Sequence, residues 1–294
     1  MSLYADGDTD GYAGGYTDNA FVRELRRSRV TQVSTVVALL YLFVGVTGPW
    51  LAPYDALELV AGPRLSPSVE HWMGTDEVGR DTFSRILVGT RTAITVGFVA
   101  IGIGLLIGGA IGLVAGFYGS VVDSVSMRLM DILLAFPGLL LALAVITFLG
   151  TGMVNTMIAI GIGGIPGYAR LVRGEVLTLL NRDHVLAARS IGATNMRLMT
   201  RHILPLAMSS VLVYSTAQLA RAILTEAGLS FLGLGIQPPT PSWGAMIASG
   251  QRSFLSAPAM GIFPGLAIMG MVFTLNLLGD SLRDALDPHQ RGRR

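Results

Sequence analysis

The sequence predicts an all-α, polytopic membrane protein with about six transmembrane helices. Apolar residues make up 51% of its 294 residues and charged residues 14%, and the mean hydropathy is +0.59. Such a composition is typical of a chain embedded in lipid rather than of a soluble core. Six apolar runs approach the length of about 20 residues that one helical span requires. The arginines between these runs are also distributed unevenly, as they are in multi-pass membrane proteins.

The six apolar runs place the expected spans in order along the chain. They cover residues 30–51, 92–118, 130–149, 154–168, 206–224 and 259–278. The fourth run is short and contains the string GGIPG at 163–167, so a tilted, a kinked and a partly re-entrant helix all stay open. Two other spans contain Pro137 and Pro264, and proline is expected to kink both helices.

The placement of arginine orients these spans. The chain has 21 basic residues, all of them arginine, and cytoplasmic loops are enriched in basic residues. With both termini inside, 15 arginines fall in inner segments and five in outer loops, whereas Arg221 falls within the fifth span. We therefore expect both termini, and the polar segment 183–205, on the cytoplasmic side.

The chain is expected to divide into a tail, a first helix with its loop, a core and a short end. Residues 1–22 are rich in Gly, Asp and Tyr without any basic residue, which predicts a disordered cytoplasmic tail. Residues 23–91 are expected to hold the first transmembrane helix and an external loop. Residues 92–288 are expected to form the core transmembrane domain, and residues 289–294 a basic C-terminal tail.

Details of packing can be predicted for the outer loops and one span. In the first outer loop, at 52–91, Asp81 is expected to cap a short helix that lies on the membrane surface. In the second, at 228–258, Trp243 is expected to be an anchor at the membrane interface. Small residues recur at intervals of four in the second span, which predicts a face where a neighbouring helix packs closely. These residues are Ala100, Gly104, Gly108, Gly112, Gly116 and Ser120.

What the sequence lacks excludes several classes of function. Without lysine the chain has no Walker A phosphate loop, which needs that residue to reach the β- and γ-phosphates. Its four histidines show no metal-ligand spacing, cysteine is absent, and no Ser/His/Asp set stands out. A net charge of +2 is too small to indicate nucleic acid. We expect no catalytic residues, no metal site, no cofactor and no nucleic-acid partner, with membrane lipid around the chain.

The segment 183–205 is polar and lies between two apolar runs. Asp183 is placed to cap a short helix, and Gly192 to end it, because glycine adopts the left-handed conformation without steric cost. Thr194 or Asn195 can cap a second short helix, which is expected to stop before the proline at the end of the segment. The result is a bent helical knob; an ordinary amphipathic loop is the alternative.

The residues of this knob resemble a known motif. Ala187-Ala188, followed by Gly192 and then by Leu204-Pro205, is similar to the EAA loop of ABC-importer permeases, although Leu186 replaces its glutamate. In that family the loop is a coupling helix that docks into a groove on the cytoplasmic ATPase. The resemblance therefore implies an ATPase-coupling role for a set of residues in the knob. They are Ala187, Ala188, Gly192, Arg197, Arg201, Leu204 and Pro205.

Further strings extend the resemblance to residues 23–288. Phe136-Pro137-Gly138, both outer loops and the segment 279–288 are similar to the dipeptide/oligopeptide/nickel branch of ABC permeases, in particular to the second, C-type permease of the pair. The resemblance implies a type I importer bundle in a prokaryotic plasma or inner membrane. It also implies a second homologous permease, two cytoplasmic ATP-binding subunits, an extracytoplasmic solute-binding protein and a peptide-like solute moved by alternating access.

Two charged residues at the fifth span suggest where solute passes. A charge at the bilayer centre is costly, so it usually faces the bundle interior or a wet cavity. We hypothesise that Arg221 and Glu226 line the translocation path, Arg221 meeting an anionic group of the solute and Glu226 a cationic one. Alternatively, Arg221 snorkels outward or pairs with an acidic residue of the partner subunit.

Other functions remain alternatives at the level of sequence. A secondary transporter or channel would need no ATPase, and a membrane scaffold would need neither kinked spans nor charges within them. Within the importer class, dipeptides, oligopeptides, nickel chelates and sugars all fit the same strings.

Overall fold

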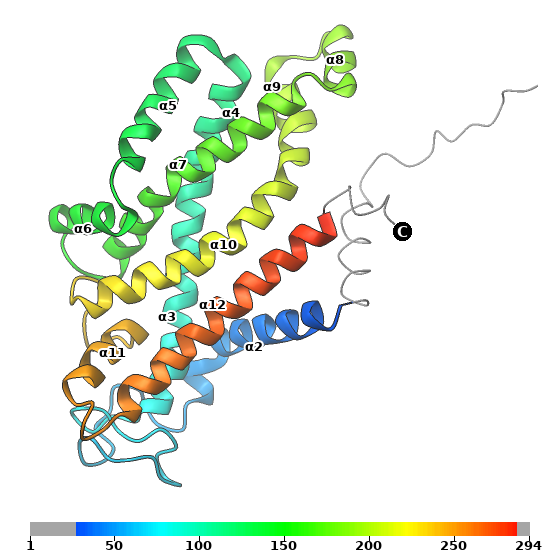
Figure 1. Cartoon of the computed structure of the whole chain (residues 1–294). Helices are drawn as coiled ribbons and strands as arrows, with labels where there is room; N and C mark the ends of the chain where they lie inside the picture. Colours follow the sequence, from blue (N-terminus) through cyan, green and yellow to red (C-terminus); the bar gives the residue numbers. More distant parts are fainter. Residues whose placement is uncertain (1–27, 287–294) are drawn as a thin grey trace, which may run out of the picture.

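The computed structural model describes residues 28–286, and these form a helical bundle (Figure 1). Their only β-type feature is an isolated bridge between Thr75 and Asp81. The elements are α2 (Arg29–Leu51), α3 (Thr82–Ile103), the π-helical η1 (Gly104–Gly108), α4 (Gly109–Tyr118), α5 (Ser120–Leu134), α6 (Gly138–Leu149), α7 (Met153–Leu179), α8 (Asp183–Ser190), α9 (Asn195–Arg197), the π-helical η2 (Leu198–Ile203), α10 (Leu204–Phe231), α11 (Trp243–Arg252) and α12 (Ala259–Leu286). The predicted all-α membrane fold is confirmed, whereas the two predicted tails lie outside the described residues.

The spans agree with the six apolar runs only in part. By length and composition four continuous helices can cross a membrane: Arg29–Leu51, Thr82–Tyr118, Asn195–Phe231 and Ala259–Leu286. The pair α5 and α6 raises this number to five if it counts as one bent span. Helix α7 contains the fourth predicted run and has 27 residues. It is not among the helices that qualify as spans, and it carries Arg170 and Arg173, which pair with Asp131 and Asp123 of α5.

Proline ends one of these helices and lies inside others. The third predicted span is not one kinked helix: α5 and α6 meet at 90°, because Pro137 adopts an extended ψ of 132°. By contrast, α7 runs unbroken through Pro166, so the re-entrant alternative is wrong. Helix α12 is likewise continuous through Pro264.

Two predictions about the outer loops are wrong, each for its own reason. Asp81 does cap a helix, accepting a hydrogen bond from the Ser84 amide at 2.7 Å, but that helix is the start of α3 and continues into the second span. Trp243 is no interfacial anchor, since its side chain is 1% exposed and its Nε1 donates to the Ile86 carbonyl. The first loop contacts α3 and α11, since Arg85 donates to the Ala56 carbonyl and Ser249 donates to the Glu77 carboxylate.

The stripe of small residues does form a helix contact, as predicted. A Cβ atom at Gly108 or Gly112 would lie 2.3 Å from the carbonyl oxygen of Ile165 or Ala169, respectively, on α7. Such close backbone approach is possible only with glycine. The stripe ends before Ser120, which begins α5 after the chain has turned at Gly119.

The two ends of the bundle carry different structures. Figure 1 shows α8 and α9 at one end, beside the turn between α4 and α5. The long loop before α3 and helix α11 lie at the opposite end. This separation fits the predicted topology, in which the segment 183–205 and the first outer loop lie on opposite sides of the membrane.

Candidate functional site

The bend of the knob (residues 183–205) is built by one left-handed glycine. Helix α8 begins at Asp183 with Arg182 as its N-cap residue, so Asp183 is not the predicted cap. The helix ends at Ser190, and Gly192 has φ of +86°, as the sequence predicts. The Gly192 amide donates to the Arg189 carbonyl at 3.0 Å, and the Ala193 amide to the Ala188 carbonyl at 3.1 Å. These two bonds form a Schellman motif, which satisfies carbonyls that the helix end leaves free.

The second half of the knob differs from the prediction. Thr194 caps the next helix, its hydroxyl accepting from the Arg197 amide, as one of the two alternatives had it. The helix does not stop before Pro205, however: α9, η2 and α10 run on without a break. Proline has no amide to donate, and the π-helical turn at Leu198–Ile203 rearranges the hydrogen bonds that precede it.

The outer surface of the knob is apolar and basic at once. Leu186 is 44% exposed, Met196 66% and Ile191 88%. Between and beside these apolar residues, Ala187, Arg189, Arg197 and Arg201 are also exposed, whereas Ala188 is buried. Exposed apolar side chains grouped on a polar segment mark a surface that another protein covers.

The inner surface of the knob is fixed to the bundle. Val185, Leu198 and Ile203 are fully buried and belong to one cluster with Val172 and Val176 of α7. Helix α10 continues directly from η2. The knob is therefore packed rigidly onto the ends of two long helices.

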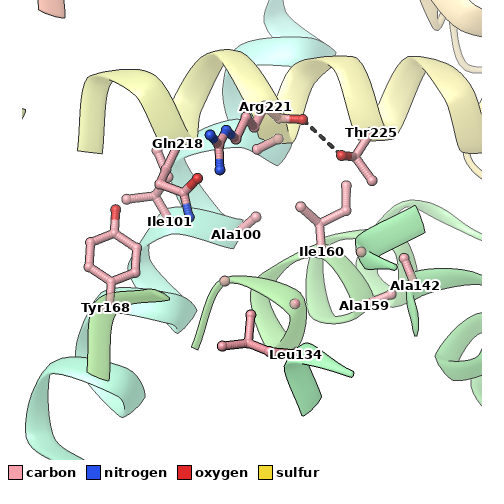
Figure 2. A pocket seen from close by; sticks show the side chains of 14 residues that line it. Ala100, Ile101, Leu134, Ala142, Ala159, Ile160, Tyr168, Gln218, Arg221 and Thr225 are labelled. Atoms are coloured by element: carbon pink, nitrogen blue, oxygen red, sulfur yellow. Dashed lines mark hydrogen bonds between the residues drawn. The ribbon is translucent and has the colours of Figure 1, made fainter. Parts of the chain in front are cut away.

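An open cavity of about 280 Å³ lies between α10 and the helices α3, α5, α6 and α7, and Arg221, which lines it, is exposed. Figure 2 shows Arg221 and Gln218 projecting from α10, with Ala100 of α3 beside them. The lining residues are Ala100, Ile101, Leu134, Gly138, Ala142, Ala159, Ile160, Gly163, Gly164, Tyr168, Gln218, Arg221, Ala222 and Thr225. No Asp or Glu is among these lining residues, so the cavity carries a positive charge.

Arg221 and Glu226 have different surroundings. Within residues 28–286 the Arg221 side chain has neither an ion pair nor a hydrogen bond, and only its carbonyl accepts, from the Thr225 hydroxyl. Glu226 is 1% exposed, and its Oε1 accepts from the hydroxyls of Ser230 and Ser242. The structure places Arg221 in the cavity and Glu226 outside its lining.

Sequence reasoning missed most of the cavity. Gln218 lies one turn before Arg221, and the i, i+3 spacing of the two polar residues in an apolar helix was a signal that could have found it. Tyr168 donates a hydrogen bond to Ser215 of α10, and Gly163 gives the cavity its open wall. Neither of these roles has a signature in the local sequence.

Comparisons with known proteins agree with this architecture. Residues 108–292 match the model of a family described as binding-protein-dependent transport system inner membrane component. The chain is 46% identical over 274 residues to the glutathione transport system permease protein GsiD of Escherichia coli O1:K1, covering 92% of this chain and 90% of that protein. It is 45% identical over 270 residues to the GsiD protein of Pectobacterium atrosepticum, with coverages of 91% and 90%.

Solved structures share the fold at lower identity. A chain of the inward-facing MetNI methionine ABC transporter aligns with a TM-score of 0.57 and 20% identity, over 69% of this chain and 97% of that chain. A chain from the crystal structure of an amino acid ABC transporter with histidines aligns with a TM-score of 0.52 and 19% identity, over 67% and 91%. The helical bundle is therefore one that ABC transporters use.

Proposed function

Because this chain belongs to the family of binding-protein-dependent transport system inner membrane components, we propose that it carries a peptide-like solute through the membrane as one permease subunit of an ATP-driven importer. Family membership confirms the resemblance to ABC-importer permeases of the peptide/nickel branch and the type I fold. The chain is thus a transport component and not an enzyme.

The proposed solute is a small peptide. The relatives that share 45–46% of their residues with this chain are named as glutathione permeases, and they match it along nine-tenths of its length. Glutathione is a tripeptide with free carboxylates. A cavity lined by an arginine without a carboxylate beside it supports such a solute, because guanidinium and carboxylate form paired hydrogen bonds.

The proposed partners are a second homologous permease, two cytoplasmic ATP-binding subunits and an extracytoplasmic solute-binding protein. The observation that carries the coupling role is the knob itself. Its inner side is packed onto the bundle, its outer side is apolar and basic, and it lies at the end of the bundle away from the first outer loop. Its left-handed glycine presents α8 at a fixed angle to a docking ATPase. In this scheme ATP closes the ATPase pair, the knobs follow, and the permease halves alternate in access.

Reconstitution tests this function. The chain, its partner permease and the ATPases are purified together, placed in proteoliposomes with the binding protein outside, and loaded with ATP. We expect uptake of labelled glutathione or a dipeptide that requires internal ATP, and copurification of the ATPase with this chain. Uptake by the chain alone without ATP would contradict the proposal and favour a secondary transporter or channel. ATP-driven uptake of nickel chelates or sugars, with none of peptides, would correct the solute only.

A further inference from the structure

The cavity between α10 and α7 combines one positive charge with unused space. Arg221 and Gln218 lie three residues apart and so share a face of α10, and neither side chain forms a hydrogen bond within the described residues. Tyr168 and Thr225 have partners already, at Ser215 and at the Arg221 carbonyl. The free polar groups of the cavity are thus a guanidinium and a carboxamide.

An unpaired guanidinium within a span needs a partner. Arg221 lies in the membrane-crossing helix Asn195–Phe231, where a charge left in apolar surroundings is costly. The cavity lining supplies no acid, and Glu226 is engaged by two serines elsewhere. The group that best satisfies a guanidinium is a carboxylate, which accepts two parallel hydrogen bonds.

Glycine forms the opposite wall of the cavity. At Gly138 and Gly163 an added Cβ atom would meet no heavy atom within 4 Å, and at Gly164 it would meet only the Gly104 Cα at 3.8 Å. At other glycines of this bundle, such as Gly108, a backbone atom lies too close to leave room for a side chain. These three positions, which we call the glycine floor, instead border open space that a side chain would fill.

We propose that this cavity is a solute subsite: Arg221, assisted by Gln218, binds a carboxylate of the solute, and the glycine floor leaves room for the uncharged remainder. The subsite deepens the proposed function and rests on it, since it assigns the class of solute to anionic peptides. The charge of Arg221 selects a solute that carries a carboxylate. The small residues of the glycine floor set the size of the rest of the solute that fits in the cavity.

The charge is tested in the assembled transporter, in proteoliposomes with binding protein and internal ATP. We expect Arg221→Gln to lower uptake of labelled glutathione about ten- to hundred-fold, the range for a charge-assisted hydrogen bond, while Arg221→Lys retains part of it. Copurification of the partner permease and of the ATPase should stay at the wild-type level. Unchanged uptake overturns the proposal. Loss of the partner permease from Arg221→Gln also overturns it, in favour of an ion pair between subunits.

The floor is tested by Gly163→Leu, with Gly265→Leu of α12 as the matched control. Both glycines have no heavy atom within 4 Å of an added Cβ, but only Gly163 lines the cavity. Gly163→Leu should lower uptake of a pentapeptide at least tenfold more than uptake of a dipeptide. Gly265→Leu should take up both peptides at the wild-type rates. Equal effects on the two peptides refute the role of the floor.

The outcomes separate this inference from the proposed function. A wild-type transporter that imports peptides, with Arg221→Gln behaving identically, leaves the function standing and removes the subsite. A wild-type transporter that imports no peptide removes both.

Discussion

Replacing Gly192 with valine should uncouple the knob without unfolding the bundle. Gly192 has φ of +86°, and an added Cβ atom would meet no heavy atom within 4 Å. The cost is therefore carried by the backbone alone, about 1–2 kcal/mol for a side chain held in the left-handed region. If the chain instead leaves that region, the two Schellman hydrogen bonds are lost, at about 0.5–1.5 kcal/mol each.

Either route shifts the equilibrium away from the native knob by about five-fold or more, since 1.4 kcal/mol corresponds to a factor of ten. The rest of the bundle is not strained, so the amount of protein in the membrane should match the wild type. We expect ATP-driven uptake and copurification of the ATPase to fall together. Both are measured on equal amounts of purified chain.

A series at the same position identifies the cause. Asparagine tolerates the left-handed region, so Gly192→Asn should retain most of the uptake, Gly192→Ala less, and Gly192→Val least. Gly174→Val is the control, because Gly174 is an exposed helical glycine of α7 with equally open space around it. Normal uptake and normal ATPase binding in Gly192→Val would refute the reasoning, as would equal impairment by asparagine and valine.

Three further predictions concern topology and packing. Single cysteines at the exposed positions Ser66 and Thr240 should react with an impermeant maleimide added outside intact cells, and one at Thr194 should not; external labelling at Thr194 would reverse the orientation. Gly112→Ala should lower the thermal unfolding temperature in detergent by several degrees, because its Cβ would meet the Ala169 carbonyl at 2.3 Å. The control Gly109→Ala should not, since its Cβ would lie 3.5 Å from the Leu105 Cδ1. Equal unfolding temperatures for the two variants would contradict the packing of α4 on α7. Glu226→Ala should lower the free energy of unfolding by about 1–3 kcal/mol, because two buried serine hydroxyls lose their acceptor. The preference of the folded transporter among peptides should not change. An altered preference would show that Glu226 lines the translocation path.

Features set by short stretches of chain could be predicted from the sequence. The apolar runs predict α2, α3 with α4, α10 and α12, because crossing a bilayer imposes a length and a composition on each helix. Gly192 could be placed in the left-handed region from its neighbours alone, and the small-residue stripe identified the face of α4 that contacts α7. These are properties of one helix or one turn.

Features set by distant contacts could not be predicted. Trp243 has the composition of an interfacial residue, but its burial depends on the Ile86 carbonyl, 157 residues away in the chain. Glu226 is held by Ser242, 16 residues further on, so its separation from Arg221 has no local signal. A proline normally marks the end of a helix. At Pro205 the helix continues, because the π-helical turn before it rearranges the hydrogen bonds.

Because the knob packs on α7, a movement of the knob would tilt that helix. Val176, in the cluster that fixes the knob, and Gly163, in the glycine floor, lie 13 residues apart on one unbroken helix, about 20 Å along its axis. A tilt of α7 by about 5° around its knob end would move Gly163 by about 2 Å. Side chains in contact lie about 4 Å apart, so a small rotation at the knob end of α7 is enough to change the space at the floor beneath Arg221.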